Sequence, residues 1–189
     1  MTIRCAWAQD PLFHLYHDEE WGVPAHDDRI HFEFLLLEGA QTGLSWAAIL
    51  NRREGYRKAF KDFDPNKVAL FDDGKVMRLL QDHTIIRNKL KINSAVKNAR
   101  RFLETQKEFG SFDEFIWSFV GHKPIQNHWQ SVFEIPAKTE VSETISKELK
   151  HRRFSFVGPT IIYALMQAVG LVNDHEINCF RYQEVRNLG

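Results

Sequence analysis

A carboxylate set among apolar side chains is the first candidate for chemistry in this sequence. Glu38 directly follows three leucines, and Trp46 comes soon after it, across a segment that is bracketed by two glycines. Burying a carboxylate is costly unless a partner or a ligand satisfies it. A carboxylate beside an aromatic ring suits a flat, cationic ligand that forms hydrogen bonds. Because charged residues are mostly exposed, the same residues also fit a solvent-facing Glu38 with Trp46 in the core.

Aromatic side chains are frequent in the same part of the chain. Each of them alone is more often a core residue than a ligand contact. Together with Trp46 and a carboxylate that looks buried, they make a binding pocket plausible. These residues are Trp7, Phe13, Tyr16 and Trp21.

Two cysteines and two histidines near the ends of the chain could form a metal site. His175 and Cys179 are four residues apart, which predicts one face of a helical turn and is an accepted ligand spacing. Cys5 and His17 could complete a Cys2His2 set, and zinc would then staple the two chain ends together. Four protein ligands leave no open position, so such a metal would be structural. Spacing alone leaves open two core cysteines and two surface histidines.

A basic window over residues 87–101 contains no aspartate or glutamate. It opens a long amphipathic helix after a short link, as in a helix-hairpin-helix element, which offers backbone N–H groups to DNA phosphates. Thr84 and Leu90 stand where glycine would ease a close phosphate approach, so a solvated basic face is the alternative. The basic residues are Arg87, Lys89, Lys91, Lys97, Arg100 and Arg101.

The composition bounds the class of protein. The 189 residues are 43% hydrophobic and 26% charged, with a formal net charge of zero, so only a local cluster can argue for nucleic acid. The lack of a long uncharged apolar run and of a secretory signal predicts a cytoplasmic protein without a membrane partner. In a reducing compartment, Cys5 and Cys179 are expected to be thiols or ligands.

The elements that must position these residues are predicted to be helices, with no strands and no repeat. One short helix runs from Asp10-Pro11 to His17, a second from Asp27 or Asp28 to Glu38, and a third from Ser45 through Arg53 or to Phe60. A capped turn starts at Asp64-Pro65, residues 121–139 are expected to be a loop, and a last turn holds His175 and Cys179. Further helices are expected over 72–82, 88–106, 111–120, 142–152 and 158–170.

Short motifs spread over nearly the whole chain match one known family in the same order. They include Arg4-Cys5-Ala6-Trp7, Tyr16-His17-Asp18, Leu37-Glu38-Gly39, Gly43-Leu44-Ser45-Trp46 and the run 170–175. On these motifs the chain resembles the bacterial 3-methyladenine DNA glycosylase I family, part of the helix-hairpin-helix DNA glycosylase superfamily. An ordered set of motifs is far more specific than any single one.

The resemblance implies an all-α fold with two lobes around a base-binding cleft. We expect one domain over residues 1–189, in which the termini form a zinc-stapled lobe and residues from roughly 45 to 120 include the helix-hairpin-helix lobe. The resemblance also implies structural zinc on Cys5, His17, His175 and Cys179. It implies that Glu38 binds the adenine edge, and that Leu44 wedges into the duplex. The expected base contacts are Trp46, Tyr16, Trp7, Trp21 and Phe13, and the expected DNA contacts are Gly43, Leu44, Arg87, Lys89 and Lys91.

The activity implied is hydrolysis of the N-glycosidic bond of 3-methyladenine in alkylated double-stranded DNA. Flipping the damaged base into the pocket would precede attack by water, and the protein is expected to act as a monomer associated with the nucleoid. Phe13 stands where a tyrosine is common, and Ala164 where some members have serine. Three alternatives remain: a glycosylase for another alkylpurine, a non-catalytic zinc-containing module that binds damaged DNA, and a zinc-stapled protein-interaction domain.

Overall fold

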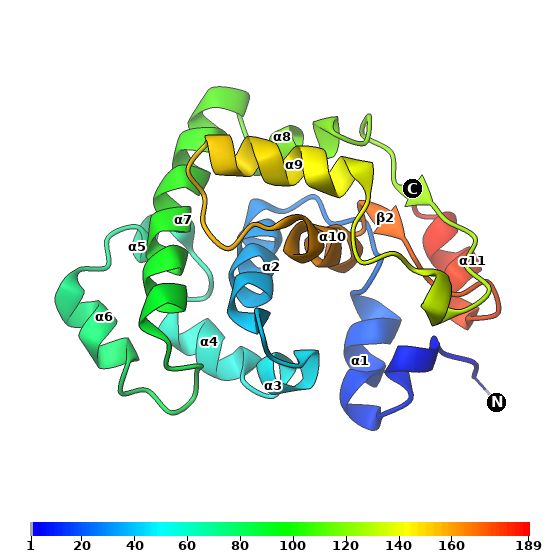
Figure 1. The fold of residues 1–189 in the computed structure, drawn as a ribbon, viewed down its shortest axis with the longest axis horizontal. Coiled ribbons are helices and arrows are strands. Elements are labelled where there is room, and N and C mark those ends of the chain that lie inside the picture. Colours follow the sequence, from blue (N-terminus) through cyan, green and yellow to red (C-terminus); the bar gives the residue numbers. More distant parts are fainter. Residues whose placement is uncertain (1) are drawn as a thin grey trace.

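Helices form most of the regular structure of the molecule. The computed structural model describes residues 2–189, and Figure 1 shows the N-terminal helix α1 (Pro11–Glu19) and the C-terminal helix α11 (Phe180–Arg186) at the same end of the molecule. The amide of Phe180 donates a hydrogen bond to the carbonyl of Ile3, which ties the two ends together. No helix within residues 2–189 has both the length and the apolar character needed to cross a membrane. The all-α fold predicted from the sequence is confirmed.

Helix α2 (Asp28–Gln41) runs through the middle of the molecule, where its residues from His31 to Ala40 are buried. The side chain of Asp27 caps it by accepting a hydrogen bond from the amide of Arg29, as the sequence predicts. The predicted end of this helix at Glu38 is wrong, because the helix continues through Gly39 to Gln41. Glu38 therefore lies inside a rigid element, and the tight turn comes after it, around Gly43.

The helix expected to start at Ser45 is divided into α3 (Trp46–Leu50) and α4 (Arg53–Ala59). The Ser45 side chain caps α3, and the chain bends at Asn51 and Arg52. The bend brings α4 against the link that precedes α7. A Cβ atom at Gly55 would lie 2.3 Å from the carbonyl oxygen of Thr84, so this approach needs glycine.

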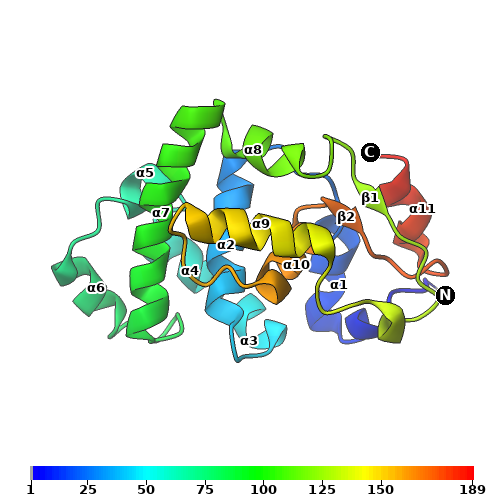
Figure 2. The same cartoon turned by 45° about the horizontal axis from the view of Figure 1, so that its top comes forward.

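Three helices form the end of the molecule that lies opposite the termini (Figures 1 and 2). They are α5 (Pro65–Val68), α6 (Asp73–Leu79) and the long α7 (Lys89–Phe109). Helix α7 buries a stripe that includes Ile92, Val96 and Ala99, and it packs on α5, α6 and α2. The helix–link–helix arrangement of α6 and α7 is therefore present.

Helices α8 (Phe112–Ser118), α9 (Glu140–His151) and α10 (Pro159–Ala168) complete the core. Helix α10 packs against both α9 and α2, and both views show α9 next to it. Helix α9 begins two residues before the predicted cap at Ser142. Thr139 caps the helix, and Ser142 completes a reciprocal capping box with Thr139.

The segment expected to be a plain loop contains two short elements. Strand β1 (Ile125–Gln126) pairs in parallel with β2 (Val172–Asn173), and a 3-10 turn, η2, spans Val132–Glu134. The prediction of no strands is therefore wrong at these residues, because two-residue strands are too short to show a period-two pattern in the sequence.

The segment that holds His175 and Cys179 is not helical, contrary to the prediction. It follows β2 as an irregular turn, and Cys179 is the residue that precedes α11. Helix α11 was not predicted. The spacing of four still brings both side chains to one point, because the turn folds back on the 3-10 helix η1 (Ala6–Ala8).

Candidate functional site

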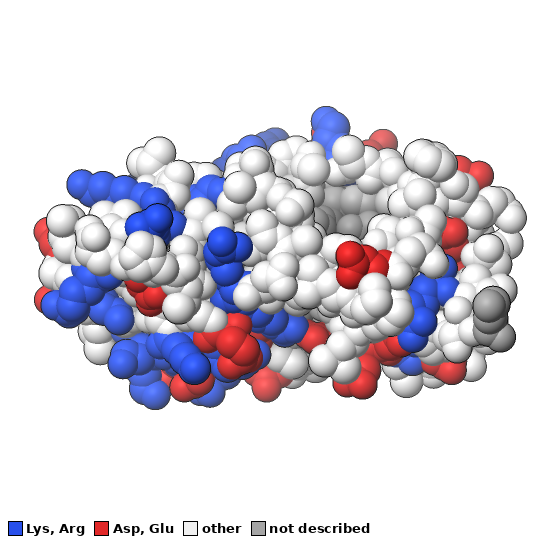
Figure 3. Space-filling model, turned by 90° about the horizontal axis from the view of Figure 1, so that it is seen from below, with Lys and Arg blue, Asp and Glu red and all other residues white. Residues whose placement is uncertain are grey.

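A cavity of about 320 Å³ lies where the N-terminal segment, the central helices α2, α3 and α10, and the segment around η2 meet. In Figure 3 a hollow opens in a largely uncharged part of this face, while lysines and arginines gather toward the end formed by α5 to α7. Helix α2 contributes two lining residues, and η1, α1, α3, α10 and the segment around η2 supply most of the others. The lining residues are Trp7, Tyr16, Trp21, Glu38, Gln41, Trp46, Val132, Ile135, Ala164 and Gln167.

Glu38 is the one carboxylate among the lining residues. Glu38 is only 5% exposed, and its carboxylate forms no hydrogen bond or ion pair with another residue of the described range 2–189. Burial alone raises the pKa of Glu38 to about 8. An unpartnered carboxylate at this depth is expensive, so the site suits a ligand that brings positive charge or hydrogen-bond donors.

Aromatic rings form the walls around Glu38. The ring centroids of Tyr16 and Trp46 are 5.1 Å apart, and those of Trp7 and Trp21 are 5.0 Å apart in an edge-to-face arrangement. Burial, with the nearby Glu38 charge, raises the pKa of Tyr16 well above its ordinary value, so its hydroxyl stays protonated. The walls therefore suit a flat ring that can stack.

Two of these rings carry unsatisfied donors. The indole N–H groups of Trp7 and Trp46 are buried and have no hydrogen-bond partner within residues 2–189. Unpaired buried donors cost stability and are rare in packed cores. We therefore interpret the cavity as shaped for a ligand and not for packing alone.

Four of the five base contacts expected from the resemblance line the cavity, together with Glu38. Phe13 does not, since its ring packs edge-on against Trp7, with 5.8 Å between centroids. The lining residues absent from that set are Gln41, Val132, Ile135, Ala164 and Gln167. Ala164 is singled out through the resemblance as a departure from the family, and Gln167 stands out in the sequence as a lone amide in the apolar run from Ile161 to Val169.

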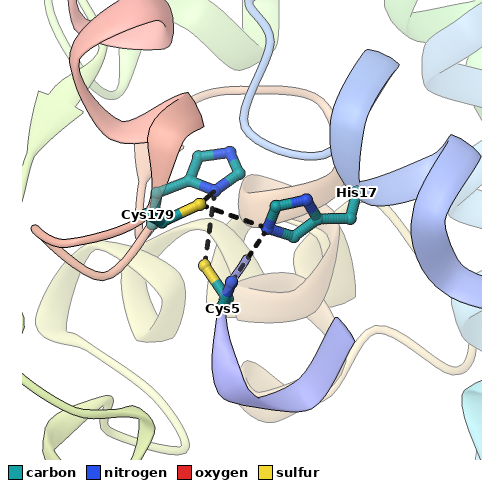
Figure 4. Close-up of side chains that lie close together, drawn as sticks. Cys5, His17 and Cys179 are labelled. Carbon is teal, nitrogen blue, oxygen red and sulfur yellow. Dashed lines mark hydrogen bonds between the residues drawn. The ribbon is translucent and has the colours of Figure 1, made fainter. Parts of the chain in front are cut away.

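The four candidate metal ligands do converge, although they come from three separate segments. All four side chains are buried, and their ligand atoms lie within 4.8 Å of one another. The Sγ atom of Cys5 is 3.4 Å from Nδ1 of His175, and that of Cys179 is 3.5 Å from Nε2 of His17. Figure 4 shows Cys5, His17 and Cys179 pointing toward a common centre.

The donor set fits zinc. Zn–S and Zn–N bonds at tetrahedral angles place S and N atoms about 3.6 Å apart, close to the separations between the cysteines and histidines. The ring nitrogens that face away from the common centre are also held by hydrogen bonds. Nδ1 of His17 lies 2.8 Å from the Asp18 carboxylate, and Nε2 of His175 lies 3.0 Å from the Trp21 carbonyl oxygen. These partners leave the inward nitrogens as lone-pair donors. The hydrogen bond from Cys5, followed by those from the histidines, lowers the pKa of the Cys179 thiol toward the thiolate that metals bind.

The expected DNA contacts occupy one turn and one hairpin. Gly43 adopts φ +76° and Leu44 is 40% exposed, so the turn between α2 and α3 projects an apolar side chain. Arg87 and Lys89 are exposed at the start of α7, and neither forms an ion pair with another described residue. The Asn88 side chain accepts hydrogen bonds from the amides of Leu90 and Lys91, so it satisfies part of this helix end itself.

Lys91 has a partner that the sequence did not indicate. Its Nζ donates to the carbonyls of Ala40 and Thr42, at 2.8 and 2.6 Å, at the C-terminal end of α2. A lysine at this position complements the negative end of the helix dipole. Burial lowers its pKa. Lys91 thus fixes the hairpin to the turn that presents Leu44.

Comparisons with known proteins agree with one another. The family model described as methyladenine glycosylase matches residues 6–182. DNA-3-methyladenine glycosylase 1 of Escherichia coli K12 is 49% identical over 180 residues, which are 95% of this chain and 96% of that protein.

Solved structures show the same likeness. A crystal structure of 3-methyladenine DNA glycosylase I aligns with a TM-score of 0.91 at 48% identity, covering 94% of this chain and 98% of that one. A Staphylococcus aureus 3-methyladenine DNA glycosylase I, solved to explain its recognition of 3-methyladenine, has a TM-score of 0.91 at 34% identity, covering 94% and 95%.

Proposed function

This chain belongs to the methyladenine glycosylase family, and from that premise we propose that it is a DNA-repair enzyme that hydrolyses the N-glycosidic bond of 3-methyladenine in alkylated DNA. The observation that carries the proposal is Glu38, a buried carboxylate without a partner in a cavity walled by rings. Methylation at N3 makes adenine a cation. A cation with an exocyclic amino group brings a positive charge and hydrogen-bond donors to the Glu38 carboxylate, which finds neither within residues 2–189.

Recognition of the base precedes the chemistry. The nucleotide leaves the stack and its base enters the cavity, between rings that include Trp46 and Tyr16. Glu38 accepts hydrogen bonds from the edge of the base, and Leu44 fills the space that the base leaves in the duplex. Unstacking costs a few kcal/mol, least for a damaged base, so selection begins with the ease of flipping.

Hydrolysis follows with little need for acid catalysis. The C1′–N9 bond breaks, its electron pair goes to the positively charged ring, and 3-methyladenine leaves as a neutral base. Water forms the new C–O bond at C1′ and gives up a proton to solvent. Glu38 stabilises the cationic base until the bond breaks. Glu38 is the only acid that lines the cavity within the described residues, so we assign no second carboxylate to the sugar.

We propose that the basic hairpin and the Leu44 turn together hold double-stranded DNA. Arg87 and Lys89 supply charge for the phosphates, and their contacts position the duplex without reading its sequence. Lys91 supports this surface from behind through the carbonyls of Ala40 and Thr42. The whole chain is proposed to act as one monomeric domain.

Zinc is proposed as a structural ion, held by Cys5, His17, His175 and Cys179. When bound, it would join the two chain ends through four protein ligands and leave no position for water or substrate. Trp7 and Tyr16 line the cavity close to two of these ligands, Cys5 and His17, so the metal would support the pocket without entering the reaction.

One assay tests the proposed function directly. The protein is incubated with duplex DNA treated with a methylating agent, and the released bases are identified by chromatography. We expect free 3-methyladenine as the main product. Release of another alkylpurine alone would reassign the substrate. Salt-sensitive binding without any released base would support a non-catalytic module.

A further inference from the structure

A second buried carboxylate, Asp174, lies behind the cavity and holds four hydrogen-bond donors. Its side chain is 1% exposed. The amide of Asn127 and the indole of Trp129 donate to Oδ1, each at 2.7 Å. The hydroxyl of Tyr163 and the amide of Gln167 donate to Oδ2, at 2.6 and 2.7 Å. Asp174 thus ties the segment before η2 to helix α10.

This contact fixes the orientation of the Gln167 amide. A carboxylate oxygen has no hydrogen to donate, so Gln167 must turn its NH2 group toward Asp174. The other half of the amide, Oε1, has no partner within residues 2–189 and is not sealed inside the protein. Because Gln167 lines the cavity, Oε1 is the group that it presents there.

We infer that Gln167 is a specificity-determining residue, whose Oε1 accepts a hydrogen bond from the amino group at C6 of the flipped base, and that Asp174 is its positioning residue. The inference rests on the proposed function and adds how the site distinguishes an alkylated adenine from an alkylated guanine. Glu38 and Gln167 come from the facing helices α2 and α10, and both line the cavity. An amino group has two hydrogens, so it can donate to both acceptors.

The same pair of acceptors rejects guanine. At C6 an adenine carries an amino donor, whereas a guanine carries a carbonyl acceptor. An alkylated guanine in the same pose would face the Glu38 carboxylate and Gln167 Oε1 with an oxygen, leaving acceptors unpaired in a buried site. Gln167 could not relieve this by rotating its amide, because its NH2 group would then lose Asp174.

The test compares purines on single variants of the full-length protein. Binding of free 3-methyladenine and 3-methylguanine is measured by tryptophan fluorescence, and release of both bases from methylated duplex DNA is measured by chromatography. Gln167→Met keeps the size of the side chain and removes the acceptor. We expect the preference for 3-methyladenine over 3-methylguanine to fall about tenfold in both assays. Gln183→Met, on the exposed face of α11, is the control for the substitution itself and should keep the wild-type preference.

Asp174→Asn tests the positioning role. An amide in place of the carboxylate offers its own NH2 group, which lets Gln167 turn and present NH2 to the cavity. We expect the relative binding of 3-methylguanine to rise, whereas a merely structural defect would weaken both bases equally. Tyr163→Phe removes one donor from the same oxygen but leaves Gln167 in place, so the preference should stay. Metal content is measured throughout, because His175 is the next residue.

The outcomes separate the inference from the proposed function. An unchanged purine preference in Gln167→Met, with active wild-type protein, overturns the role of Gln167 only. Equal weakening of both bases in Asp174→Asn overturns the positioning role. A wild-type protein that neither binds nor releases 3-methyladenine overturns the proposed function and the inference with it.

Discussion

At the scale of single residues, the main feature of the site is a buried carboxylate that forms no hydrogen bond within residues 2–189. Glu38 lies inside α2, so its side chain cannot swing out to solvent as it could at a frayed helix end. The unliganded protein bears a burial cost that a cationic base relieves. The affinity for the lesion and the instability of the empty site therefore have the same origin.

The substitution Glu38→Gln is expected to lower excision of 3-methyladenine about 100-fold, because one charged hydrogen bond to the cationic base becomes a neutral one. The fold should persist, since the amide has nearly the same shape. Single-turnover release from methylated duplex measures the effect, with circular dichroism as the control for folding. Excision at the wild-type rate would contradict the assigned role.

The raised pKa of Glu38 predicts a pH dependence of stability. The native state keeps this proton up to about pH 8, whereas the unfolded chain releases it near the ordinary value of 4.5. Native protein thus binds more protons in this window, so its stability is greatest at low pH and falls as pH rises, by about 1.4 kcal/mol per pH unit.

Urea unfolding of the wild type and of Glu38→Gln between pH 5 and about 8 should reveal this slope only in the wild type. Two parallel stability curves would show that Glu38 is ionised throughout. In the same window, kcat/KM should rise with pH in the wild type, because the ionised carboxylate is the form that favours a cation.

At the scale of elements, the hairpin depends on how closely α4 approaches it. Gly55→Ala would place a Cβ atom 2.3 Å from the Thr84 carbonyl, so the 83–86 link must move. We expect a destabilisation of about 2 kcal/mol and weaker duplex binding, with free-base binding retained. Thermal unfolding and fluorescence titration with duplex DNA measure the two effects.

Gly74→Ala provides the matched control. At that position in α6 the nearest atom would be a side-chain oxygen 3.4 Å away, an ordinary contact. Alanine favours a helix over glycine, so this variant should be as stable as the wild type or slightly more stable. A loss of stability in both variants would mean that the close approach at Gly55 is not the cause.

The junction of η1, α1 and α11 depends on its four proposed ligands. Cys179→Ser is expected to abolish bound zinc and to cost about 4 kcal/mol, which corresponds to a fall of roughly 8–16 °C in Tm. Elemental analysis and thermal unfolding report the two quantities. His122→Ala removes a half-exposed histidine elsewhere and should change neither. Full metal content in Cys179→Ser would refute the ligand set.

At the scale of the whole molecule, the sequence predicted best what depends on neighbouring residues. The helix starts after Asp10, Asp27 and Asn88 follow from caps that act within one turn, and the structure has them. The Lys91 contact with α2 and the Val132 wall of the cavity depend on residues far away in the chain. Local sequence patterns hold no information about packing between distant segments, so these two features could not be predicted from the sequence.

The chain has no net charge, so binding to DNA must depend on where the charges lie. If Arg87 and Lys89 each neutralise one phosphate, the double variant Arg87→Ala/Lys89→Ala should reduce the slope of log Kobs against log salt by about 1.8. Fluorescence anisotropy over a range of salt concentrations measures it. Lys147→Ala on α9 is the control and should keep the slope, and an unchanged slope in the double variant would remove these residues from the interface.

Burial of both cysteine sulfurs protects a protein that has to act while methylating agents are still modifying the DNA. The electrophiles that methylate adenine also attack thiolates, and they would alkylate an accessible zinc-binding cysteine. Cys5 is 1% exposed and Cys179 is 4% exposed. The fold therefore shields its own most reactive atoms from the chemical agent whose lesions it removes.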